Sequence, residues 1–179
     1  MAISGKRPYW EARELVLVGV FAAATKLSSL LIALAGGGMN PLSLMAKNGV
    51  FTTLLIVLLM KVPKPGTLLL FTLVSTLVSA LMMGSSITLL PTSMAAALLA
   101  EALGYRFRGH VWNAWLLAGL FDFFAKALSL GVSYLFLRES PSIMMMVVPV
   151  VLIGYVGSVA GLWMGWKTVG ELKHAGFVR

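Results

Sequence analysis

The chain has 179 residues, of which 59% are hydrophobic and only 11% charged, and its 14 basic and 6 acidic residues give a formal net charge of +8. A soluble domain carries about 25% charged residues, so this chain has too few to cover a water-exposed surface. It is predicted to be a single integral membrane domain, residues 1–179. The basic residues lie at the ends of apolar runs, where membrane topology explains them and excludes nucleic acid as a partner. The absence of cysteine excludes disulfides and thiol catalysis.

Six apolar runs follow one another along the chain, and each is close to the roughly 20 residues that a helix needs to cross a bilayer. The first covers residues 15–36 and ends where three glycines and Pro41 interrupt the helix. The second ends at the segment K-V-P-K-P-G, whose prolines cannot continue a helix. The predicted fold is therefore an all-α bundle of six transmembrane helices, with spans at about 15–36, 42–60, 67–83, 87–103, 111–136 and 142–166.

The distribution of basic residues predicts the orientation. One side of the predicted topology collects ten basic residues, and the other side has only Arg138; the ten are Lys6, Arg7, Arg13, Lys61, Lys64, Arg106, Arg108, Lys167, Lys173 and Arg179. Because basic residues are retained in cytoplasmic loops, both termini are predicted to be cytoplasmic. Glu101 falls at the cytoplasmic end of the fourth span and is expected to pair with Arg106 or Arg108.

Apart from Glu101 at the end of the fourth span, four charged side chains lie inside the predicted spans: Lys26, Lys47, Asp122 and Lys126. A charge inside a membrane costs a few kcal/mol or more, so something must offset it. Asp122 and Lys126 are four residues apart and can pair on one helix face, or Asp122 can reach Lys26 at a similar depth. In either arrangement three cations face one anion, which favours a bound carboxylate or phosphate. The structural alternative is that Lys47 and Lys126 extend toward water while Asp122 pairs with Lys26.

Uncharged polar residues near the predicted outer face could line the mouth of a ligand pocket. These candidates are Asn40, Asn48, Ser85 and Tyr134, and for each of them ordinary loop chemistry is the alternative. Together with Lys26, Lys47, Asp122 and Lys126 they form the predicted substrate-binding set. Both histidines lie outside the spans, so no metal site and no cofactor is predicted.

Small residues mark two helix-packing surfaces. In the first span, Gly19, Ala22 and Ala23 let another helix approach closely and are predicted to form a partner interface, which Lys26 borders. The last span has glycines every four residues, at 157, 161 and 165. This second stripe indicates packing within the chain or, alternatively, contact with another subunit.

The chain resembles the substrate-binding S component of an energy-coupling factor (ECF) transporter, and within these proteins the Trep_Strep (MptS-like) group. The resemblance rests on the start E-L-V-L-V-G-V-F-A-A (14–23), the segment K-V-P-K-P-G (61–66), the ending E-L-K-H-A-G-F-V (171–178) and the six short spans.

This resemblance implies an ATP-driven importer in the cytoplasmic membrane of a prokaryote. The chain would bind a small vitamin-like solute from outside, carrying a carboxylate or another anion, and would release it inside by reorienting. Its expected partners are a coupling transmembrane subunit, which contacts Gly19 and Ala23, and two ABC-type ATPases. The chain has no G-x-x-x-x-G-K-[ST] phosphate loop, so it is not expected to be an enzyme. The alternative is a small secondary transporter or channel that works alone as an oligomer.

Overall fold

A computed structural model describes residues 9–37, 40–83, 90–105, 113–137 and 141–174. Within these ranges the chain forms six α-helices and no strand. The helices are α1 (Ala12–Gly36), α2 (Pro41–Lys61), α3 (Thr67–Met83), α4 (Leu90–Tyr105), α5 (Asn113–Leu137) and α6 (Pro141–His174). The chain is therefore the all-helical bundle that its composition predicts.

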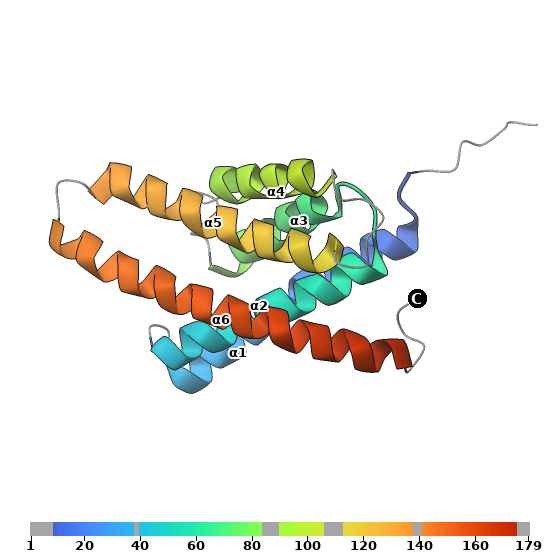
Figure 1. Cartoon of the computed structure of the whole chain (residues 1–179), viewed down its shortest axis with the longest axis horizontal. Helices are drawn as coiled ribbons and strands as arrows, with labels where there is room; N and C mark the ends of the chain where they lie inside the picture. Colours follow the sequence, from blue (N-terminus) through green and yellow to red (C-terminus); the bar gives the residue numbers. More distant parts are fainter. Residues whose placement is uncertain (1–8, 38–39, 84–89, 106–112, 138–140, 175–179) are drawn as a thin grey trace, which may run out of the picture.

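The helices run back and forth between two ends of the bundle (Figure 1). We call the end where α1 begins and α6 finishes the near end, and the end where α1 finishes and α6 begins the far end. Four helices are long and apolar enough to cross a membrane, namely α1, α2, α5 and α6. The apolar helices α3 and α4 have 17 and 16 residues, which gives each a length of about 25 Å at 1.5 Å per residue.

Helix α2 lies at the centre of the bundle, and α1, α5 and α6 all pack against it. Its residues Leu55, Ile56 and Leu58 are at most 2% exposed, and Phe71 of α3 and Phe121 of α5 complete the same core. The outer faces of the other helices remain apolar, as lipid contact requires.

Glycines bring the backbones of α2 and α6 into contact. A Cβ on Gly157 would lie 2.6 Å from the carbonyl oxygen of Met45, and a Cβ on Gly161 would lie 2.5 Å from that of Gly49. The hydroxyl of Thr53 on α2 also donates a hydrogen bond of 3.1 Å to the carbonyl of Gly161. The glycine stripe of the last span is thus used inside the chain, which is one of the two readings that the sequence allows.

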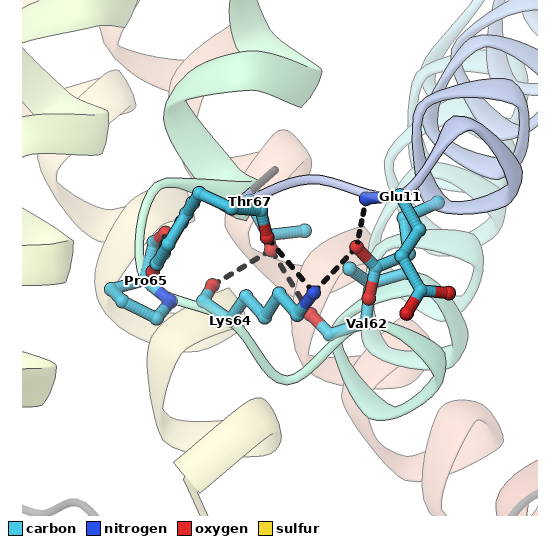
Figure 2. Close-up of polar contacts among 7 residues, drawn as sticks. Glu11, Val62, Lys64, Pro65 and Thr67 are labelled. Carbon is cyan, nitrogen blue, oxygen red and sulfur yellow. Dashed lines mark hydrogen bonds and ion pairs between the residues drawn. The ribbon is translucent and has the colours of Figure 1, made fainter. Parts of the chain in front are cut away.

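Polar contacts at the near end hold the start of α1 against the turn between α2 and α3 (Figure 2). The ammonium of Lys64 lies 2.6 Å from the Glu14 carboxylate, which also accepts a bond of 2.9 Å from the backbone N–H of Glu11. The Thr67 hydroxyl donates to the carbonyls of Val62 and Lys64, at 3.0 and 2.7 Å. The pair of Lys64 with Glu14 thus joins the first turn of α1 to the turn between α2 and α3, and the Thr67 bonds hold that turn together.

Glu101 of α4 caps the first turn of α3. Its two carboxylate oxygens accept the backbone N–H groups of Gly66 and Leu68, at 2.9 and 2.8 Å. A carboxylate at a helix N-terminus is stabilised by the free N–H groups there. The expected partners Arg106 and Arg108 lie outside the described residues, and the observed role of Glu101 is this helix cap.

Candidate functional site

The central feature of the site is an ion pair on α5. The ammonium of Lys126 lies 2.5 and 2.6 Å from the two carboxylate oxygens of Asp122, one helical turn away. Asp122 is 8% exposed, and Lys126 is half-buried. Of the two partners that the sequence allows for Asp122, the structure shows Lys126.

Helix α6 supplies further contacts to Lys126. Its ammonium donates a bond of 2.5 Å to the hydroxyl of Ser158, which in turn donates to the carbonyl of Gly154 at 3.1 Å. The ring of Tyr155 lies 5.0 Å from the same ammonium, which is within the range of a cation–π contact. The Tyr155 hydroxyl donates to the carbonyl of Phe123 at 3.0 Å.

Gly154 brings Asn48 of α2 into the same neighbourhood. A Cβ on Gly154 would lie 3.2 Å from Cε of Lys126, a tight contact, and 3.5 Å from the amide nitrogen of Asn48, so both side chains lie beside Gly154. The Asn48 amide donates to the carbonyl of Leu44 at 2.8 Å. We call this group the polar cluster, and its members are Asn48, Asp122, Lys126, Tyr155 and Ser158.

The polar cluster is electrically neutral as it stands. Asp122 balances Lys126, and Asp122 together with Ser158 takes up the ammonium protons. An incoming anion would therefore have to displace one of these oxygens from Lys126. Among the described residues no three histidine, aspartate or glutamate side chains are grouped to hold a metal ion. The chemistry of the cluster is that of hydrogen bonding and charge recognition.

The other residues of the predicted outer set are dispersed. Lys47 is half-buried and directly precedes Asn48 on α2. Asn40 is exposed and caps α2, where its side-chain oxygen accepts the Leu42 N–H at 3.0 Å. Tyr134 is 58% exposed and lies eight residues beyond Lys126, about 12 Å along α5. Ser85 lies outside the described residues. Asn40 therefore has the structural role that the sequence left open, and Tyr134 is separate from the cluster.

Lys26 also lies away from the polar cluster. It is half-buried on α1, which packs mainly against α2 and α3, whereas the cluster forms where α5 and α6 meet α2. The carboxylate of Asp122 is occupied by Lys126, so the alternative pairing of Asp122 with Lys26 is wrong.

The small residues of α1 divide between two faces. Ala22 is 0% exposed and packs in the core with Val18, so its predicted place in a partner interface is corrected. Gly19 and Ala23 are only partly buried, and a Cβ built on Gly19 would meet no atom within 4 Å. Gly19 and Ala23 are thus accessible on the outside of the bundle whereas Ala22 is not, and the role of Gly19 and Ala23 in a partner interface stays a prediction.

Reasoning from sequence missed the α6 half of the polar cluster. Ser158 is 2% exposed and Tyr155 is half-buried, and both contact Lys126. The sequence held a signal for a polar contact on α6. Ser158 is a polar residue in a mostly apolar span, and it follows Gly154 by one turn, so both lie on one helix face.

No protein-family model matches the chain, and no curated protein matches it in sequence. Among solved structures, the chain is similar to a crystal structure of an S component of an ECF transporter. The TM-score is 0.56 and the sequence identity 18%, over 93% of this chain and 87% of the other. The six-helix bundle therefore has the fold of an S component. The narrower Trep_Strep (MptS-like) group stays a prediction.

Proposed function

We propose that this chain is the substrate-binding subunit of an ATP-driven ECF-type importer in the cytoplasmic membrane of a prokaryote. It binds a small vitamin-like solute bearing a carboxylate or another anion at the outer face. A coupling transmembrane subunit and two ABC-type ATPases then drive the reorientation that delivers the solute inside. In this proposal the near end of the bundle is cytoplasmic and the far end faces out.

The observation that carries the proposal is the S-component fold, which extends over 93% of the chain. The polar cluster supports it independently. Charged groups inside a membrane bundle are costly and commonly mark a pathway or a binding site. Here Asn48, Asp122 and Lys126 come together from two helices, with Ser158 from a third.

The ammonium of Lys126 supports an anionic solute. It is the cation of the polar cluster, and two of its partners are the carboxylate of Asp122 and the hydroxyl of Ser158. A carboxylate that approaches Lys126 would replace the Ser158 hydroxyl as its third hydrogen-bond partner and would gain a charge-assisted bond.

The packing of α6 argues against the alternative of an oligomeric secondary transporter. That alternative used the glycine stripe as a subunit interface, whereas Gly157 and Gly161 contact the α2 backbone of the same chain. A stand-alone transporter would therefore need a different surface for assembly.

The function is tested by reconstituting the purified chain in liposomes, alone and together with the coupling subunit and ATPases from the same source. Native mass spectrometry of the purified chain first identifies the small molecule that it retains. We expect ATP-dependent uptake of that molecule only with the complete assembly. Uptake by the chain alone would support the secondary transporter and contradict the proposal.

The electrostatic part is tested separately with Lys126→Met. This variant should weaken binding of the retained carboxylate compound far more than binding of its neutral amide analogue. An equal loss for both compounds would remove the charge argument and leave the importer proposal intact.

A further inference from the structure

Lys26 lies too deep in the bundle for its charge to reach water easily. It is two residues past Ala24, the midpoint of the 25-residue helix α1, which is about 3 Å along the axis. With α1 centred in a hydrocarbon layer about 30 Å thick, the nearer boundary is about 12 Å away. A lysine stem extends about 6 Å and leaves an α-helix toward its N-terminus, which here is the longer route.

The described part of the chain offers Lys26 no counter-charge. Five of the six acidic side chains are described: Glu11, Glu14, Glu101, Asp122 and Glu171. Glu11 and Glu14 lie in the first turn of α1, Glu101 caps α3, and Glu171 lies in the last turn of α6. Asp122 is bound to Lys126. No ion pair within the described ranges includes Lys26.

The position of Lys26 around α1 indicates where a counter-charge can come from. At 100° per residue, Lys26, Gly19 and Ala23 lie within about 60° of one another around α1. Their flank adjoins the buried face of Val18 and Ala22, and a Cβ on Gly19 would find no neighbouring atom within 4 Å. A small solute at the polar cluster would lie where α5 and α6 meet α2, whereas α1 packs mainly against α2 and α3.

We infer that Lys26 pairs with a carboxylate that a helix of the coupling subunit carries at mid-membrane depth, when that helix packs on the flank formed by Gly19 and Ala23. The inference rests on the proposed function and adds the chemistry of the contact. The small residues let the partner backbone approach, and the half-buried cation selects a partner helix that carries an acidic residue at the same depth in the membrane. Before docking, Lys26 would be an unpaired charge inside the membrane, which is costly. Pairing with the partner carboxylate removes this cost and therefore also favours assembly.

The inference is tested by co-purification in lipid nanodiscs of the tagged chain with its coupling subunit and ATPases. Lys26→Met and Lys26→Gln remove the charge and should each lower the recovered complex about tenfold or more, because they leave the partner carboxylate unpaired. Lys26→Arg keeps the charge and should retain most of the complex. Leu27→Met is the matched control, since Leu27 is 52% exposed on the adjacent face, and should behave as wild type. The retained small molecule and the melting temperature of the isolated variants should not fall.

Three results would overturn the inference. Wild-type recovery of the complex with both uncharged variants would show that the charge is not used in docking. Loss of the retained small molecule from Lys26→Met, with the complex intact, would assign Lys26 to the solute. Failure of the wild-type chain to recover a coupling subunit or ATPases would contradict the proposed function itself, and the inference with it.

Discussion

Replacing Asp122 with asparagine removes the only described carboxylate that contacts Lys126 and leaves the ammonium with Ser158 and the Tyr155 ring. The side chains of Lys126 and Asp122 are only 14% and 11% exposed, so solvent compensates little for the loss. Breaking a buried ion pair by removing one partner costs about 3–5 kcal/mol. Because Ser158 and Tyr155 remain, we expect Asp122→Asn to lower the free energy of unfolding by about 3 kcal/mol, the lower end of that range.

The double variant Asp122→Asn with Lys126→Met removes both charges and provides the control. Exchanging a buried pair for uncharged residues of similar size is often nearly neutral. We therefore expect the double variant to be within about 1 kcal/mol of wild type, so that adding Lys126→Met recovers about 2–3 kcal/mol of the loss caused by Asp122→Asn. The free energies are measured by titration with a denaturing detergent, followed by fluorescence of the five tryptophans.

Additive losses in the two single variants and the double variant would refute this reasoning, because independent sites do not compensate each other. Native mass spectrometry on the same proteins then separates stability from recognition. If the pair contributes to solute binding as proposed, the stable double variant should still lose the retained small molecule. Retention by the double variant would restrict the pair to a structural role.

Three further predictions concern other parts of the bundle. Gly161→Ala should lower the free energy of unfolding by about 1–3 kcal/mol, since its Cβ would lie 2.5 Å from the Gly49 carbonyl oxygen. The control Gly170→Ala should not lower it, because a Cβ there meets no atom within 4 Å, and equal stabilities of the two variants would contradict the packing of α6 on α2. Gly19→Leu should abolish ATP-dependent uptake while the isolated chain keeps its small molecule, and loss of both would show that this surface is internal. Glu101→Gln should weaken the cap on α3, which lowers the free energy of unfolding by about 1 kcal/mol and with it the melting temperature. An unchanged melting curve would exclude the capping role of Glu101.

Local spacing allowed part of the site to be predicted. The pairing of Asp122 with Lys126 depends only on the helical repeat, which brings residues four apart onto one face. The approximate positions of the helices follow from runs of apolar residues bounded by glycine and proline. The contacts of Lys126 with Ser158 and Tyr155 depend on how α5 and α6 are aligned, and no local pattern specifies that alignment.

The error at Ala22 has a related physical cause. In a soluble helix the apolar stripe marks the inward face, but lipid accepts apolar side chains on every side. Val18 and Ala22 face the core while Val20 and Leu27 are exposed, and nothing in their hydrophobicity distinguishes the two pairs. Small size indicates where a helix can approach closely, without indicating whether that helix belongs to the same chain or to a partner.

The backbone contact between α2 and α6 constrains how this molecule can change shape. Two helices interlocked at Gly49, Gly157 and Gly161 cannot slide past each other without steric overlap, so they rotate or tilt together as one rigid body. Asn48 belongs to that body and so does Ser158, while Lys126 reaches them from α5. A rearrangement that separates Lys126 from Ser158 therefore moves α5 relative to the interlocked pair.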